Sequence, residues 1–160
     1  MAVDAEDAPV IATWWREADI IDYRLLRMRQ GQWQRAATGL RNSDFPLGGH
    51  GTRRFPCARP AVLTGRDGSI LLVLRDDLWD GRAALARFRW VPEGLQKEGF
   101  QLLTETSMGS WEPCCDPVLW QQEQQLEVLM LKSGARQDGA PATAEAAPLS
   151  SLRMSGWEEA

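Results

Sequence analysis

Two short proline-cysteine motifs frame the residues of this chain that could do chemistry. Residues 56–60 read Pro-Cys-Ala-Arg-Pro, and residues 113–117 read Pro-Cys-Cys-Asp-Pro. Arginines gather at the first motif, and a tryptophan and two carboxylates gather at the second. A guanidinium holds a carboxylate through two parallel hydrogen bonds, and an indole offers a flat apolar face to a sugar ring. These residue types predict a site for an anionic sugar, with substrate-binding candidates Arg53, Arg54, Arg75, Trp79, Trp111 and Glu112.

The motifs belong to a longer internal repeat. A second echo supports it, because Leu-Arg-Met at residues 26–28 is followed by Trp33, and the same triplet at residues 152–154 is followed by Trp157. Repeats of several tens of residues are typical of arrays and propellers.

Short β-rich runs separated by turn residues carry these motifs, and no long helical periodicity interrupts them. Asp67-Gly68 is a strong hairpin signal between two apolar runs. The pattern predicts an all-β chain. The expected strands are residues 10–16, 20–28, 33–38, 61–64, 69–75, 83–90, 100–106, 118–121, 126–131 and 149–154.

Grouped by the repeat, these strands form the last three of one four-stranded unit, one whole unit and the first three of another. Radially repeated four-stranded units are propeller blades, and a ring typically needs at least four blades. The fold prediction is therefore a partial β-propeller of about two and a half antiparallel blades, a fragment in one incomplete domain over residues 1–160; a small two-sheet sandwich is the alternative. The expected parts are a blade portion (9–40), a loop (41–58), a full blade (59–107), and a further blade (108–157) with a flexible loop at 134–147.

Composition excludes several classes of function. With 44% hydrophobic and 25% charged residues among 160, the chain can build the core of one ordinary domain. A net charge of -4 argues against nucleic acid as a partner. No apolar run is long enough to span a membrane, and the acidic residues 1–7 are unlike a signal peptide.

The cysteines and the single histidine predict neither a metal site nor a cofactor. Cys57, Cys114 and Cys115 are an odd number, so reduced thiols are expected, with a Cys57–Cys114 disulfide as the alternative. Together with His50 they match no closed zinc motif. We expect no metal and no cofactor.

The motifs resemble those of propellers with bacterial neuraminidase (BNR) repeats. The resemblance rests on the arginine-rich residues 53–60, on Leu-Arg-Asp at 74–76, and on Trp-Glu-Pro at 111–113 followed by Asp116 and Leu119-Trp120. It covers residues 9–157, although the sialidase Asp-box Ser-x-Asp-x-Gly-x-x-Trp is not intact. The resemblance implies carbohydrate chemistry of a sialidase-like hydrolase or a polysaccharide lyase, and an extracytoplasmic setting for the parent protein. The chain itself leaves localisation open.

That resemblance assigns catalytic candidates. In a lyase, arginine such as Arg59 would neutralise a uronate carboxylate while His50 removes the α-proton and Tyr23 serves the leaving oxygen. In a hydrolase, arginines would clamp the carboxylate and a tyrosine paired with an acid would attack. The catalytic candidates are His50, Tyr23, Arg59 and Asp116.

Several candidate site residues also have a structural explanation that involves no ligand. Arg59 and Asp116 occupy matching places in the repeat and are equally compatible with a structural ion pair. Arg75 at a strand end is more simply solvated or capping a loop, and His50 between two glycines is more simply an exposed histidine. We expect core packing from Trp14, Trp15, Trp33, Trp90 and Trp120, which leaves Trp79 and Trp111 as the better sugar platforms.

Two functions therefore remain open from the sequence. One is part of a glycan-active enzyme, and the other is a propeller-type module that binds a glycan or protein without turnover. An anionic glycan is the expected partner in the first case. Uncovered blade edges also predict self-association.

Overall fold

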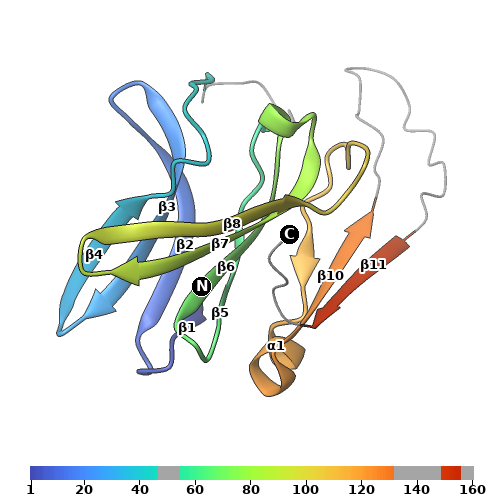
Figure 1. The fold of residues 1–160 in the computed structure, drawn as a ribbon. Coiled ribbons are helices and arrows are strands. Elements are labelled where there is room, and N and C mark those ends of the chain that lie inside the picture. The colour runs from blue at the N-terminus through green and yellow to red at the C-terminus, as the bar shows by residue number, and fades with distance from the viewer. Residues whose placement is uncertain (47–54, 132–148, 156–160) are drawn as a thin grey trace.

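Three antiparallel sheets, each made from one continuous stretch of chain, form the computed structural model (Figure 1), which describes residues 1–46, 55–131 and 149–155. The first sheet has the order β1-β2-β3-β4 and the second β5-β6-β7-β8. The third has the order β11-β10-β9. The all-β prediction is confirmed, and none of the three sheets is closed.

The elements follow one another along the chain with one helical turn and one short helix between strands. In the first sheet they are β1 (Ala2–Val3), β2 (Pro9–Glu17), β3 (Ile20–Arg29) and β4 (Gln32–Ala37). In the second they are β5 (Ala61–Thr64), β6 (Ser69–Asp76), the 3₁₀ turn η1 (Asp77–Trp79), β7 (Arg82–Val91) and β8 (Gly94–Leu102). The third region holds β9 (Cys114–Cys115), α1 (Pro117–Glu123), β10 (Gln125–Leu131) and β11 (Leu149–Ser155).

Tight turns set the registers of the first sheet. Ala18 and Asp19 connect β2 to β3 with φ of 50° and 62°, and Gln30 and Gly31 connect β3 to β4 with φ of 51° and 75°. Two consecutive residues with positive φ match the right-handed twist of the flanking strands, so such turns favour two-residue hairpins. These hairpins place Val10 opposite Arg27 and Met28 opposite Trp33.

The second sheet is the middle layer, as Figure 1 shows. Every residue of β6 is buried, and its side chains alternate between two hydrophobic cores. Leu72 and Leu74 pack in the core shared with the first sheet. Leu71 and Val73 pack in the core shared with the third sheet. A strand buried on both faces explains why residues 70–74 read as a continuous apolar run rather than an alternating one.

One expected strand is wrong. Residues 118–121 lie in α1, because the Asp116 carboxylate accepts hydrogen bonds from the amides of Val118 (2.9 Å) and Leu119 (3.0 Å) and Pro117 occupies the first turn. An aspartate N-cap followed by proline favours a helix start over a strand. The short strands β1 and β9 were not expected, so the first sheet has four strands rather than three. The strand expected at 100–106 instead spans Gly94–Leu102 as β8.

Candidate functional site

The two repeated motifs are joined by an ion pair between Arg59 and Glu112, and not by the expected pair of Arg59 and Asp116. Arg59 Nε lies 3.2 Å from Glu112 Oε2, and the Arg59 amide donates to Glu112 Oε1 over 3.3 Å. The alternative ion pair between Arg59 and Asp116 is therefore wrong, since Asp116 caps α1. The Arg59 side chain is 85% exposed, so solvent screens its interaction with Glu112. His50, Arg53 and Arg54 lie outside the described residues.

Arg75 is bound inside the protein rather than solvated. Its side chain is only 2% exposed, and Nη2 donates to the carbonyl of Phe55 over 3.0 Å. Nη1 lies 3.3 Å from an Asp77 carboxylate oxygen. The Arg75 carbonyl in turn accepts a hydrogen bond from the Ala58 amide, so Arg75 fastens the first motif to the end of β6. This is a positioning contact and not an open anion site.

The two expected sugar platforms are half-buried against the cores. The Trp79 ring lies 4.8 Å from the Phe100 ring and packs on the core between the first and second sheets. Trp111 packs on the core between the second and third sheets. Their large apolar faces contribute to inter-sheet packing, the role that we had expected of other tryptophans.

The Tyr23 side chain is also buried in the interior. It is 0% exposed, and its hydroxyl donates to Asp76 Oδ2 over 3.2 Å. Burial, and then the nearby Asp76 charge, raise the pKa of Tyr23 far above its ordinary value. Arg41 forms a buried ion pair with the same carboxylate. Tyr23 and Arg41 both come from the first sheet region and Asp76 ends β6, so this cluster joins two sheets and leaves no hydroxyl for a substrate.

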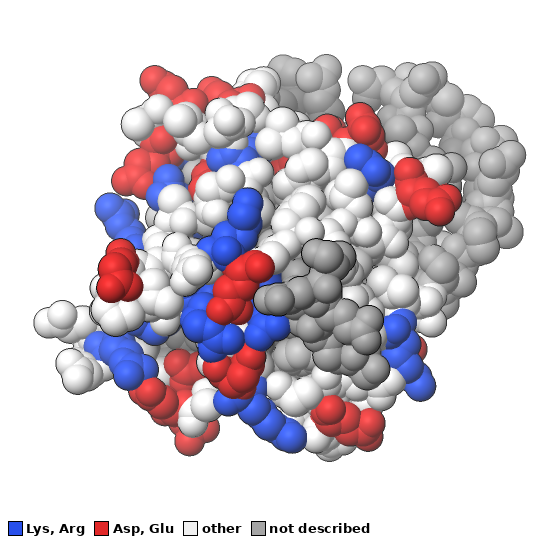
Figure 2. Space-filling model, in the orientation of Figure 1, with Lys and Arg blue, Asp and Glu red and all other residues white. Residues whose placement is uncertain are grey.

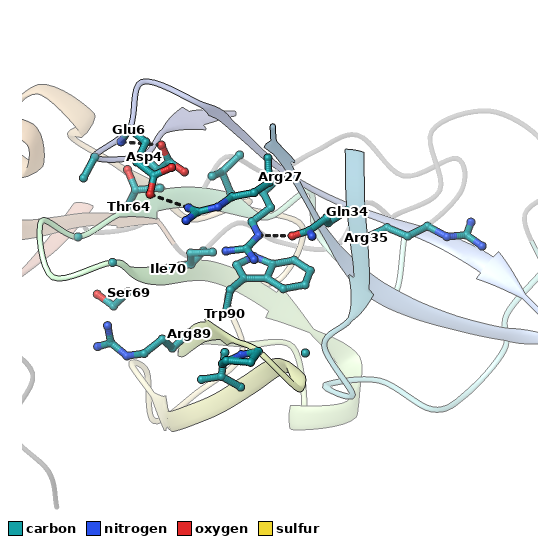
Figure 3. A pocket seen from close by; sticks show the side chains of 18 residues that line it. Asp4, Glu6, Arg27, Gln34, Arg35, Thr64, Ser69, Ile70, Arg89 and Trp90 are labelled. Atoms are coloured by element: carbon teal, nitrogen blue, oxygen red, sulfur yellow. Dashed lines mark hydrogen bonds and ion pairs between the residues drawn. The ribbon is translucent and has the colours of Figure 1, made fainter. Parts of the chain in front are cut away.

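A groove of about 790 Å³ opens between the first and second sheets, and Figure 3 shows the side chains that line it. It lies at the β5–β6 turn and the first residues of β6, whereas the first motif (residues 56–60) approaches the opposite end of these strands. The Arg59–Glu112 pair and the groove are thus at opposite ends of the second sheet. The second motif continues into α1, which lies at the same end as the groove, where Trp120 Nε1 donates to the Thr64 carbonyl over 2.8 Å. The polar lining of the groove includes four arginines and two acids, namely Arg27, Arg29, Arg35, Arg89, Asp4 and Glu6.

Arg27 and Trp90 form the centre of this groove. β3 alternates so that Tyr23, Leu25 and Arg27 share its inward face, with Arg27 at the end where the core opens. The Arg27 guanidinium lies over the Trp90 ring, 4.4 Å from the centroid. Its Nε donates to Gln34 Oε1 over 2.8 Å. Figure 3 shows the guanidinium between the Gln34 amide and the Trp90 indole. Stacking and hydrogen bonding together hold its plane in one orientation.

The neighbouring arginines already form ion pairs, although Arg35 shares its acid with Arg24. Arg29 pairs with Glu6 at 2.6 Å, and Arg35 lies 3.6 Å from Glu17. Arg89 pairs with Glu98 and Asp67. Within the described parts of the chain Arg27 has no such ion pair. Burial, and secondarily the charge of Arg29, lower the pKa of Arg27. The charges of Asp4 and Glu6 offset part of this lowering.

Charge on this side of the molecule is mixed rather than uniformly basic. Figure 2 shows arginine or lysine side chains interleaved with acidic ones across the middle of the view. Arg87 and Arg89 of β7, for example, both contact Asp67 and Glu98. The described basic and acidic side chains on this face are thus paired rather than gathered into a patch of one sign.

Asp67 anchors the turn at the edge of the groove, and its titration should be visible in stability. Partial burial by itself would raise the pKa of Asp67, but hydrogen bonds from Ser69 and Arg89 and the charge of Arg87 outweigh it and lower the pKa from 3.8 to about 2. The stabilisation is present above the unfolded pKa and is lost as pH falls through the folded one. We expect the stability advantage over Asp67→Asn to shrink between about pH 4 and pH 2.

Chemical denaturation of both proteins at pH 6, 4 and 3 checks this expectation. Because the Asp67 side chain is 51% exposed, solvent screening keeps the effect modest. A difference that stays constant through this range would show that Asp67 is not held ionised by its partners.

The groove could not be found in the sequence because its residues lie on four separate stretches, 4–10, 27–35, 64–70 and 89–94. One signal was present: an arginine at position 27 continues the inward-facing series of Tyr23 and Leu25, where an apolar residue would be ordinary. Trp90 is one of the predicted core tryptophans, and it does contact the core beside the groove. Of the other four tryptophans, Trp14 and Trp120 pack on the cores. Trp15 is half-buried beneath the Arg24 guanidinium, which lies 5.5 Å from its ring centroid, and the core role predicted for Trp33 is wrong because Trp33 is 50% exposed.

Thiol and metal chemistry find no support in the described regions. All three cysteines are free, so the Cys57–Cys114 disulfide is not formed. Burial, followed by the charge of Asp76, raises the pKa of Cys57 to about 12. Burial, followed by the charge of Cys114, raises the pKa of Cys115 to about 11. No group of three or more His, Cys, Asp or Glu residues in these regions is arranged to hold a metal ion.

No helix in residues 1–46, 55–131 and 149–155 has the length and apolarity to cross a membrane.

Comparisons with known proteins find no family model that matches the chain and no curated protein similar to it. The resemblance to BNR-repeat propellers therefore stays a prediction that rests on the quoted motifs.

Proposed function

We propose that this chain is a propeller-type module that binds an anionic carbohydrate in the groove between its first two sheets, without turnover. The observation that carries the proposal is the Arg27 guanidinium, stacked on Trp90 and without an ion-pair partner among the described residues. An oriented cation at the centre of an open groove is suited to an anionic group of a ligand.

The arrangement of the sheets supports the propeller part of the proposal. Each sheet comes from one continuous stretch of chain, and the second packs on the first and third through separate cores. Successive sheets stacked face to face are the geometry of adjacent blades. Under this proposal the groove lies between two blades.

The rest of the lining suits a sugar better than a simple inorganic anion. Apolar side chains of Ile70, Val91 and Pro92 lie beside polar groups of Gln34 and Ser69. Sugar rings combine apolar faces with hydroxyl groups that both donate and accept hydrogen bonds. A mixed lining of this kind can contact both parts of a ring.

Binding without turnover is favoured because the catalytic candidates do not form a site in the described regions. Tyr23 is enclosed in the core, Asp116 caps α1, and Arg59 pairs with Glu112 at the other end of the second sheet from the groove. General acid-base chemistry requires its groups within hydrogen-bond reach of one substrate.

The test is calorimetric titration of the chain with short oligogalacturonate, a uronate-containing glycan. We expect saturable binding that Arg27→Ala weakens by about tenfold or more, the usual worth of a charge-assisted hydrogen bond. Arg153→Ala is the matched control, because Arg153 is an exposed arginine of the third sheet paired with Glu127. No new reducing ends or unsaturated products should appear.

Arg59→Ala separates the groove from the repeated motifs. If Arg59→Ala abolishes binding while Arg27→Ala does not, the ligand binds at the motifs and the groove assignment is wrong. Product formation by the unmodified chain would contradict the absence of turnover.

A further inference from the structure

From the pairing of charges in the groove we infer, resting on the proposed function, that it recognises a uronate carboxylate held end-on by the two terminal nitrogens of Arg27, and that it selects against sulfated glycans. This names the anionic group and the atoms that receive it. The geometry of one side chain and the charges around it carry the inference.

The first step is the orientation of the guanidinium. Arg27 Nε is occupied by Gln34 Oε1 at 2.8 Å, so the edge formed by Nε and Nη2 is not free for a bidentate ligand. Trp90 covers one face of the group at 4.4 Å. The remaining edge carries Nη1 and Nη2, for which no acceptor is found among the described residues. Two parallel N–H donors on one edge match the two oxygens of a planar carboxylate.

The second step is the number of charges that the groove can accept. Arg29, Arg35 and Arg89 form ion pairs with Glu6, Glu17, Glu98 and Asp67. Arg27 forms no ion pair among the described residues, although the charges of Asp4 and Glu6 act on it from across the groove. Asp4 and Glu6 also line the groove, and their carboxylates repel further negative charge. A ligand with one charge per sugar ring is compensated there. A densely sulfated chain would bring extra charges close to Asp4 and Glu6.

The third step is what holds Asp4 and Glu6 in place. Asp4 Oδ1 accepts hydrogen bonds from the amides of Glu6 and Ala8, both at 2.9 Å, and Glu6 is tied to Arg29. Both carboxylates are thus anchored in the connection between β1 and β2. The anchored Asp4 carboxylate therefore stays at the groove when a polyanion approaches, and its repulsion contributes to selectivity.

A ligand series tests the inference on the unmodified chain. The probes are oligogalacturonate, its methyl ester of the same length, and dextran sulfate of similar length. We expect the ester and the sulfated chain each to bind at least about tenfold more weakly than the free acid at equal ionic strength. Equal affinity for acid and ester would overturn the role of the carboxylate, and equal or tighter binding of dextran sulfate would overturn the selectivity.

Two substitutions test the geometry. Arg27→Lys keeps the positive charge but removes the planar pair of donors, so we expect the preference for acid over ester to fall by about tenfold. Gln34→Leu removes the acceptor that holds Arg27 Nε, so the guanidinium can turn and is no longer presented end-on. We expect the ratio of the affinities for oligogalacturonate and dextran sulfate to fall by a larger factor than the affinity for oligogalacturonate itself. Arg153→Ala should change neither ratio. An Arg27→Lys protein with unchanged ratios would contradict end-on recognition.

The outcomes also separate the two proposals. If no probe binds, the proposed function fails and the inference fails with it. If the probes bind but do not differ, the chain binds glycans while the inference alone is wrong.

Discussion

Asp76→Ala is expected to lower the free energy of unfolding by about 3–5 kcal/mol, the usual cost of removing one member of a buried ion pair. Asp76 is 0% exposed, and its partner Arg41 has a side chain that is only 4% exposed. Without the carboxylate, the Arg41 guanidinium would stay in the interior with no counter-charge. The same substitution removes the cap of η1, where Asp76 accepts a hydrogen bond from the Leu78 amide at 2.9 Å.

Tyr23→Phe is the matched control for that prediction. It deletes one hydrogen bond to Asp76 and leaves the ion pair with Arg41, so we expect a loss of only about 1 kcal/mol. Urea denaturation of both variants measures the difference. A Tyr23→Phe protein as unstable as Asp76→Ala would show that the hydroxyl, and not the ion pair, joins the two sheets.

The second large effect is expected from the two cores on opposite faces of the middle sheet. Leu72→Ala and Leu85→Ala should each lower the free energy of unfolding by about 2–5 kcal/mol, because each leaves a cavity among buried side chains. Leu72 lies in the core shared with the first sheet, and Leu85 in the core shared with the third. Both are almost fully buried, at 0% and 1% exposure.

Unfolding curves followed at once by tryptophan fluorescence and far-ultraviolet circular dichroism distinguish local from global effects. If the three sheets fold as one cooperative unit, each variant shifts a single transition seen by both probes. Two separate transitions, of which Leu72→Ala moves one and Leu85→Ala moves the other, would contradict that expectation.

These stability predictions bear on the groove, because it lies between the first and second sheets. The cluster of Tyr23, Arg41 and Asp76 joins these sheets at one end, and the groove opens at the other. Arg27 comes from the first sheet and Trp90 from the second, so their stacking depends on the sheets keeping their spacing. Loss of the buried ion pair should therefore weaken the proposed glycan binding, because it alters the spacing of the two sheets.

Local pattern was sufficient for most of the strands. The apolar alternation and the turn residues predicted β2, β3, β5, β6, β7, β10 and β11 to within a few residues. Asp67-Gly68 lies in the turn between β5 and β6, with φ of 81° at Gly68. The helix α1 was missed because its apolar residues 118–120 satisfy a strand pattern too, and the local signal that decides between them is the cap at Asp116 with the following proline.

Side-chain roles depended on contacts between distant parts of the chain. In the sequence, Tyr23 is a candidate proton donor. In the structure its hydroxyl donates a hydrogen bond in the core to Asp76, which lies on another sheet. In the sequence, Arg75 is most simply a solvated residue at a strand end. In the structure its guanidinium donates hydrogen bonds to the carbonyls of Phe55 and Pro56.

The sequence alone determined that the chain is all-β, which the structure confirms. The repeated strand units and the anionic-sugar site are predictions from the same spacing. These properties follow from local spacing, which the sequence displays directly. Only the tertiary structure decided which arginine meets which acid, and therefore that Arg27 stays unpaired in the described groove while Arg59 does not. The pairing of arginines with acids depends on how whole sheets pack against each other, and no short stretch of sequence encodes that packing.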